Sequence, residues 1–129
     1  HTSKQEILGL QKSIDQIEVL ESIHVDSVIH TLMHMIQDTN HADDTDYTKL
    51  VAAYKAQDIR ALYTLIAACK ELGDWGIFLD GRNKKWIPRM TDKMKLSSVF
   101  FAVGAGHLGG DTGVIALLQQ EGYTVVPVN

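Results

Sequence analysis

The glycine-rich stretch from Val103 to Gly113, VGAGHLGGDTG, contains the residue types best suited to chemistry in this chain. It holds five of the ten glycines and one histidine, His107. Glycine allows a ligand to approach the backbone closely, and an imidazole can ligate a metal, transfer a proton or bind an anion. We therefore predict that His107 is a catalytic residue and a metal ligand, and that Gly104 and Gly106 contact a bound cofactor.

Two other interpretations of this stretch remain open. Gly104, Gly106 and Gly109 spell the pattern G-x-G-x-x-G, which in a dinucleotide-binding unit cradles a pyrophosphate. Such a unit also needs an acidic ribose partner about 20 residues later, and Glu121 comes too early. The second interpretation is a tight turn in which His107 is a bystander.

Two further groups of residues have spacings that could serve a site. His30 and His34 lie four residues apart, a spacing that can chelate zinc, although the chain lacks the glutamate of a metallopeptidase helix between them. Arg82 and Trp86 share one face of a predicted helix. Arg82 either steadies a carboxylate or a substrate near His107, as a catalytic residue, or stacks on Trp86 in a structural role.

The composition limits the function classes. The chain has 129 residues, 45% of them hydrophobic and 22% charged, which fits one globular domain over residues 1–129. The net charge of −4, without a basic cluster, argues against nucleic acid as a partner. No apolar run reaches the roughly 20 residues that span a bilayer. The single cysteine, Cys69, excludes an internal disulfide and has the helical spacing of a buried thiol.

The pattern of apolar residues predicts helices and strands in an α/β order. Apolar residues at helical spacing alternate with short β-branched or aromatic runs and with glycine and proline breaks. We predict strands over 6–10, 97–106 and 123–128, and helices over 15–23, 25–37, 47–58, 59–72, 77–94 and 113–122, with a kink or a break at Pro88. The fold class is then a small, mainly parallel sheet with a helical insertion and a C-terminal βαβ unit.

Three strands are few for so many helices. The imbalance predicts either a part of a larger α/β protein or a sheet that a second copy of the chain completes. The chain also begins with His1 rather than methionine, which favours the first of these two expectations.

The segment FFAVGAGHLGGDTGVIALLQQEGYTVVPV resembles the C-terminal signature of the TraB/GumN family, which includes the Tiki proteases. Three upstream segments are similar to the family in the same order. The segment EILGLQKSIDQIEVL resembles its Gly-Leu-Glu segment, LVAAYKAQDIRAL its aromatic-x-x-x-Asp helix, and LDGRNKKWIPRM its Arg-Asn-x-x-Trp segment. The resemblance covers nearly the whole chain.

The resemblance implies a domain like those of the erythromycin-esterase and ChaN-like proteins. In Tiki-like members it implies metal-dependent peptide hydrolysis at two Gly-x-x-His motifs and acidic residues. Only the second motif, Gly104 to His107, is present, so the chain resembles the C-terminal part of the family domain. Gln11 stands where the Gly-Leu-Glu pattern has a carboxylate, and a neutral amide cannot act as a base or a charged ligand.

Two functions follow as expectations. The first is part of a metal-dependent, peptidase-like hydrolase with manganese, cobalt or zinc at His107, whose site the missing N-terminal half of the family domain completes. The alternative is a non-catalytic member or fragment that binds a peptide or a small-molecule ligand in a regulatory role. A homodimer that completes the sheet is a third arrangement. The sequence does not define the cellular compartment, and it is compatible with an exported or membrane-anchored parent protein.

Overall fold

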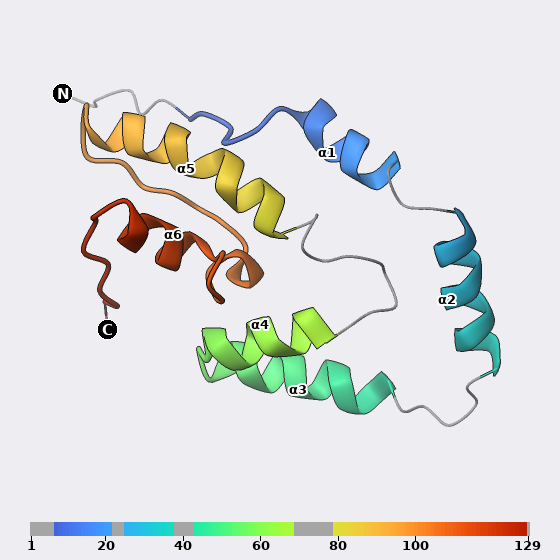
Figure 1. Cartoon of the computed structure of the whole chain (residues 1–129). Helices are drawn as coiled ribbons and strands as arrows, with labels where there is room; N and C mark the ends of the chain where they lie inside the picture. Colours follow the sequence, from blue (N-terminus) through green and yellow to red (C-terminus); the bar gives the residue numbers. More distant parts are fainter. Residues whose placement is uncertain (1–6, 22–24, 38–42, 69–78, 129) are drawn as a thin grey trace.

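The computed structural model describes residues 7–21, 25–37, 43–68 and 79–128, and all regular secondary structure in these ranges is helical. The elements run in the order α1 (Ser13–Glu21), α2 (Val25–Gln37), α3 (Asp43–Lys55), α4 (Ile59–Ala68), α5 (Gly81–Met94), the 3-10 turn η2 (Ala105–His107) and α6 (Val114–Gln120) (Figure 1). Helix α3 packs on α4, α4 on η2, and α5 on α6.

The predicted α/β fold with a parallel sheet and a C-terminal βαβ unit is wrong. Residues 98–104 and 123–128 have no regular secondary structure, and no strand occurs among the described residues. The part of the predicted first strand that is described, residues 7–10, is not a strand either. A strand forms only where a second backbone segment pairs with it. The amino-acid composition of one segment does not show whether such a partner exists.

The apolar residues of the predicted strand 97–106 pack against helices instead. Phe101 and Val103 pack against the main hydrophobic core, whereas Phe100 is 90% exposed. The segment after α5 returns along that helix toward η2 (Figure 1). The alternation of buried and exposed residues therefore arises because one side of this irregular segment packs against helices. The sequence alone does not distinguish such a segment from a half-buried strand.

The predicted helices are present, with shifted ends. Helix α2 has the predicted bounds, and α3 begins four residues before the predicted start. The turn from α3 to α4 uses Gln57 in the left-handed region, at φ 57°, and the Asp58 carboxylate accepts a hydrogen bond from the Ala61 N–H at 2.9 Å. Asp58 thus caps α4. The predicted end of this helix at residue 72 and the predicted buried thiol of Cys69 lie outside the described residues.

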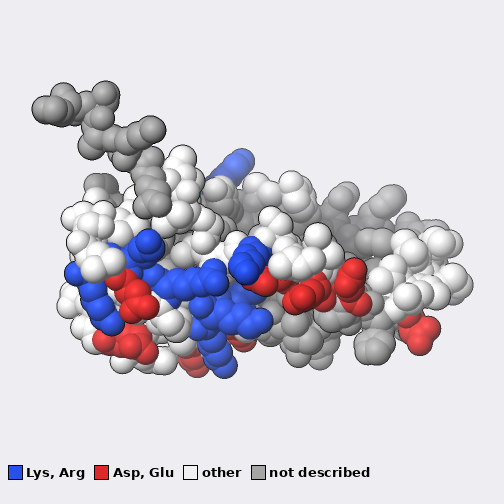
Figure 2. Space-filling model, turned by 90° about the horizontal axis from the view of Figure 1, so that it is seen from above, with Lys and Arg blue, Asp and Glu red and all other residues white. Residues whose placement is uncertain are grey.

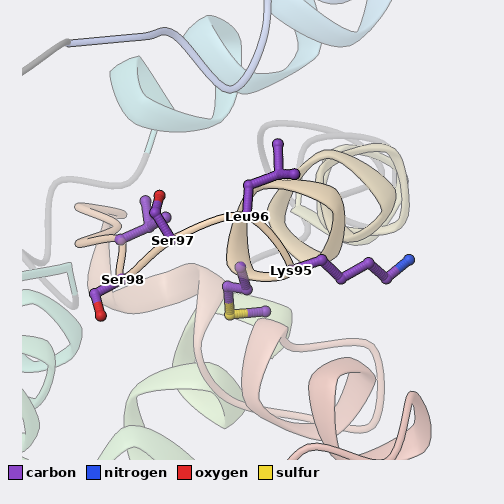
Figure 3. A pocket seen from close by; sticks show the side chains of 6 residues that line it. Lys95, Leu96, Ser97 and Ser98 are labelled. Carbon is purple, nitrogen blue, oxygen red and sulfur yellow. The ribbon is translucent and has the colours of Figure 1, made fainter.

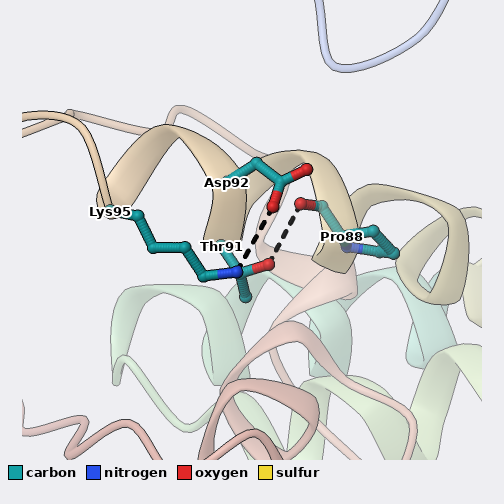
Figure 4. Close-up of polar contacts among 4 residues, drawn as sticks. All are labelled: Pro88, Thr91, Asp92 and Lys95. Carbon is teal, nitrogen blue, oxygen red and sulfur yellow. Dashed lines mark hydrogen bonds and ion pairs between the residues drawn. The ribbon is translucent and has the colours of Figure 1, made fainter.

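Helix α5 continues through Pro88 without a break. The proline lies on the exposed face of the helix, where water can satisfy the carbonyl that lacks its N–H partner. Local side-chain contacts follow it: Thr91 Oγ1 donates to the Pro88 carbonyl at 3.0 Å, and Lys95 Nζ lies 3.4 Å from Asp92 Oδ1 (Figure 4). The predicted break at this proline is therefore absent.

The main core lies between α5 and α6. Its buried members are Trp86, Ile87, Met90 and Val114. The partly buried residues that pack on it are Leu10, Met94, Phe101, Val103, Leu117 and Leu118. None of the helices in the described ranges is both long and apolar enough to cross a membrane. The core brings the N-terminal segment, α5 and the glycine-rich loop together, and this arrangement positions the site.

Candidate functional site

The candidate site is the group of side chains around His107, which we call the His107 cluster. It consists of Gln11, Arg82, Asn83, Trp86 and His107. Helix α5 supplies three of these residues from its first two turns, and η2 supplies His107. Asn83 is 1% exposed, Trp86 4% and His107 8%, so polar groups of the cluster are removed from water and need partners.

Asn83 connects α5 to the glycine-rich loop. Its Nδ2 donates to the carbonyl of Thr112 at 2.9 Å and to the carbonyl of His107 at 3.3 Å. Its Oδ1 lies 2.7 Å from His107 Nδ1. One buried amide therefore holds the middle of the loop, its C-terminal end and the imidazole.

These contacts fix the tautomer of the imidazole. Carbonyl oxygens only accept hydrogen bonds, so the atom of Asn83 that faces two carbonyls must be its nitrogen. The oxygen then faces the imidazole, and His107 Nδ1 must carry a hydrogen to donate to it. In the neutral ring the lone pair is left on Nε2, for which no described residue provides a hydrogen bond.

The surroundings keep this imidazole neutral. Burial, and second the nearby positive charge of Arg82, lower the pKa of His107 from 6.5 to about 4. At neutral pH the ring is therefore uncharged, with Nε2 available as an acceptor or a metal ligand.

Aromatic stacking and Gln11 complete the cluster. The rings of Trp86 and His107 have centroids 4.6 Å apart, and the Arg82 guanidinium lies 5.0 Å from the Trp86 ring centroid. Gln11 Oε1 accepts hydrogen bonds from Arg82 Nε and from Trp86 Nε1, both at 2.9 Å. Arg89 adds a bond of 2.6 Å to the Leu10 carbonyl, which fastens the N-terminal segment to α5. Arg82 thus stacks on Trp86 and also influences His107.

The glycines in the loop have a packing role. Helix α4 lies against the loop, so that a side chain at Gly106 would press on Ile66, and one at Gly109 would meet the backbone of Ile59 and the side chain of Tyr63. Gly110 has φ 80° and faces the same tyrosine ring. Close helix packing therefore accounts for these glycines, and the contact of Gly104 and Gly106 with a cofactor stays a prediction.

Substitution of Gly113 by alanine tests a second packing role of the loop glycines, which is close contact of the loop with its own backbone. A Cβ at Gly113 would collide with the carbonyl oxygens of Gly109 and Leu108, whereas one at Gly104 would make ordinary contact with His107 Cδ2 at 3.7 Å. We expect Gly113→Ala to lower the free energy of unfolding by about 2 kcal/mol, measured by urea denaturation. Gly104→Ala, the matched control, should change it by less than about 0.5 kcal/mol. Equal effects would contradict the packing explanation.

The residues that precede α6 act through their backbone. From the sequence, Asp111 and Thr112 are candidates for a side-chain N-cap of this helix. Gly113 instead occupies that position, without a side-chain cap, and the Thr112 carbonyl accepts the bond from Asn83. The N-cap interpretation is therefore wrong.

A shallow hollow at the end of α5 is separate from the cluster. It is lined by Met94, Lys95, Leu96, Ser97, Ser98 and Val99. Figure 3 shows these side chains spread around the turn that follows the helix, without the convergent polar groups expected of a binding site. This hollow carries no functional assignment.

The described residues do not contain a complete metal site. They include no group of three His, Cys, Asp or Glu residues that could hold an ion. Helix α2 spans the predicted pair His30 and His34, but the side chains of both residues lie outside the described part. His107 is therefore the one predicted ligand whose surroundings can be assessed.

The sequence pattern predicts roles for His107 and Arg82, whereas Asn83 stands out only as the second residue of the Arg-Asn-x-x-Trp segment, without a role of its own. The available signal was its position on the buried face of α5, because Asn83, Ile87 and Met90 are spaced as successive residues of one apolar stripe. A polar residue in such a stripe requires a hydrogen-bond partner, and here that partner is the loop.

Comparison with known proteins gives one match. The model of the TraB/PrgY/gumN family matches residues 1–127. No curated protein and no solved structure matches the chain significantly.

Proposed function

The chain belongs to the TraB/PrgY/gumN family, and from this premise we propose that His107 is the reactive nitrogen of a metal-dependent, peptidase-like hydrolase site. The observation that carries the proposal is the pair of bonds from Asn83 Nδ2 to two carbonyls. They leave Asn83 Oδ1 to hold the imidazole Nδ1–H, so Nε2 keeps its lone pair.

The low basicity of His107 favours a ligand role over a general-base role. A general base works best when its pKa is near the operating pH, and the pKa of His107 is about 4. A metal ion needs a neutral imidazole, and a low pKa removes competition from protons at pH 7. An oxygen acceptor that holds the other ring nitrogen is also the usual support for a histidine ligand.

Among the described residues, His107 could supply one ligand of such a metal site, and the other ligands are absent from this part of the chain. A catalytic zinc site has about three protein ligands, and the cluster offers one imidazole beside the positive charge of Arg82. We propose that the remaining ligands come from another segment of the protein or from a second copy. A bound manganese, cobalt or zinc ion would polarise a peptide carbonyl and lower the pKa of a water molecule.

The described residues of this chain would hold the imidazole in place and orient the substrate. Asn83 holds the ring plane and the tautomer of His107, and Trp86 covers one side of the imidazole. Arg82, held through Nε by Gln11, would orient the substrate.

A second candidate function is ligand binding without catalysis. It is favoured by Gln11, which offers a neutral amide where the Gly-Leu-Glu pattern would give a carboxylate. Without that acid the cluster has donors and an imidazole but no charged base among the described residues. The chain would then bind a peptide or a small molecule in a regulatory role.

Calorimetric titration with manganese, cobalt and zinc chloride tests the ligand role. We expect binding to the full chain, weakened by about tenfold or more in His107→Ala, and unchanged in the double variant His30→Ala/His34→Ala. Circular dichroism of each variant verifies that it is folded.

Two results would overturn the assignment. Loss of binding in the double variant alone would move the metal to α2. Absence of binding by the unmodified chain would remove the ligand role of His107 in this chain and leave the non-catalytic candidate.

A further inference from the structure

Arg82 is a cation without a counterion in the described part of the chain. Its Nε donates to Gln11 Oε1, but no acceptor among the described residues faces its Nη groups, and no carboxylate there pairs with it. The side chain is half-buried, and burial lowers the pKa of its guanidinium. A guanidinium of this kind stays charged in proteins, so its charge is uncompensated within the described residues.

Gln11 shows the same excess of donors. Both groups that face its Oε1, Arg82 Nε and Trp86 Nε1, can only donate, so the orientation of the amide is fixed. Its Nε2 is buried and has no hydrogen-bond partner in the described ranges. A buried donor without an acceptor costs stability, and such a group in a native structure calls for an explanation.

The surroundings of Arg82 attract anions. Helix α5 contains five basic residues and one acid, although the whole chain has a net charge of −4. Figure 2 shows its Lys and Arg side chains gathered on one surface, beside acidic side chains of the α1 region. Arg82 also lies in the first turn of α5, near the positive end of the helix dipole.

We propose that Arg82, held by Gln11 and stacked on Trp86, binds a carboxylate group of the substrate or ligand. This inference rests on the proposed function for the identity of the site and adds the chemistry of what the site recognises. The Nη groups donate to the carboxylate oxygens, while Gln11 Oε1 and the Trp86 ring fix the guanidinium plane. A planar, preoriented guanidinium suits a carboxylate because both can form two parallel hydrogen bonds.

The carboxylate could come from a peptide C-terminus or from an acidic side chain. Both present the same planar anion to Arg82. The test therefore starts with acetate as the probe and then uses N-acetylalanine for the terminal group and N-acetylglutamic acid α-amide for the side-chain group.

The experiment is a nuclear magnetic resonance titration of the full chain without metal, in the presence of a chelator and at constant ionic strength. The reporters are the N–H groups of Arg82 Nε and Trp86 Nε1, which both donate to Gln11. We expect saturable shifts with acetate at roughly millimolar concentration and none with acetamide. Of the two larger probes, the one that binds more tightly identifies the source.

Two variants with one positive charge fewer provide the comparison. Arg82→Gln should weaken acetate binding by about tenfold or more, whereas Arg60→Gln, which changes an exposed arginine on α4, should leave it unchanged. Equal responses in both variants, or the same shifts with acetamide, would overturn the proposal.

Gln11→Glu provides a test that leaves Arg82 in place. The new carboxylate would neutralise the charge of the guanidinium from within the chain and leave no orphan amide hydrogen. We expect acetate binding to disappear in this variant while the chain stays folded. Undiminished acetate binding would contradict the proposal.

The acetate titration and the metal titration test two different proposals. Acetate binding is measured without metal and depends on Arg82, while metal binding is measured without acetate and depends on His107. Failure of one titration with success of the other identifies which proposal is wrong.

Discussion

Replacement of Asn83 by alanine is expected to lower the free energy of unfolding by about 3 kcal/mol. Asn83 is 1% exposed and has three hydrogen bonds, so its removal strands the His107 Nδ1–H and two carbonyl oxygens. A buried polar group without a partner costs roughly 1–3 kcal/mol, and relaxation of the loop recovers part of that sum. Urea denaturation followed by circular dichroism measures the change.

The neighbouring lysine provides the control for this variant. Lys84 is exposed and lies one position along α5, so Lys84→Ala should change the free energy of unfolding by less than about 0.5 kcal/mol. Asn83→Asp separates the two roles of the amide, because a carboxylate can accept from His107 Nδ1–H but cannot donate to the carbonyls. If Asn83→Ala were as stable as Lys84→Ala, the amide would not hold the loop.

The second large effect is a loss of stability below neutral pH that depends on His107. The pKa of this imidazole is about 4 in the folded chain and near 6.5 in the unfolded chain. Between these values the unfolded state binds a proton and the folded state does not, so unfolding is favoured as the pH falls. The neutral His107 side chain therefore makes its full contribution to the free energy of unfolding above pH 6.5. This contribution decreases by about 3 kcal/mol as the pH approaches 4.

Urea denaturation of the unmodified chain and of His107→Gln, from pH 7.5 to pH 4.5, measures this effect. The difference between the two curves removes the contributions of the other titrating groups. We expect that difference to shrink steadily below pH 6.5. A difference that does not change with pH would show that the folded imidazole titrates normally. Arg82→Gln should reduce the pH dependence, because the Arg82 charge is the second cause of the low pKa.

The sequence predicted the helices better than the fold. The stripe of apolar residues in α2 defined its two ends, because helix formation depends on contacts three and four residues apart. The segment around Phe101 has strand-like residues, but a strand needs a second segment to pair with. That partner is a property of the whole chain, so local composition could not decide between a sheet and an irregular segment packed on helices.

The sequence pointed to His107 and Arg82 as site residues and gave no role to Asn83, which holds the imidazole. His107 stands out because a histidine among glycines is unusual, and Arg82 and Trp86 share a helix face that the spacing defines. Asn83 could be recognised only as a polar residue in a buried stripe, and the spacing does not say which loop would face it. Gln11 is separated from Arg82 by 71 residues, and no periodicity connects positions so far apart.

The His107 cluster joins contacts of very different sequence separation, and this has a consequence for its assembly. Asn83 and His107 are 24 residues apart, whereas Gln11 lies 71 and 75 residues from Arg82 and Trp86. Closing the longer loop costs about 1 kcal/mol more chain entropy. Chain entropy therefore favours the contact of α5 with the glycine-rich loop, which sets the tautomer of the imidazole, over the docking of the N-terminal segment, which fixes the guanidinium.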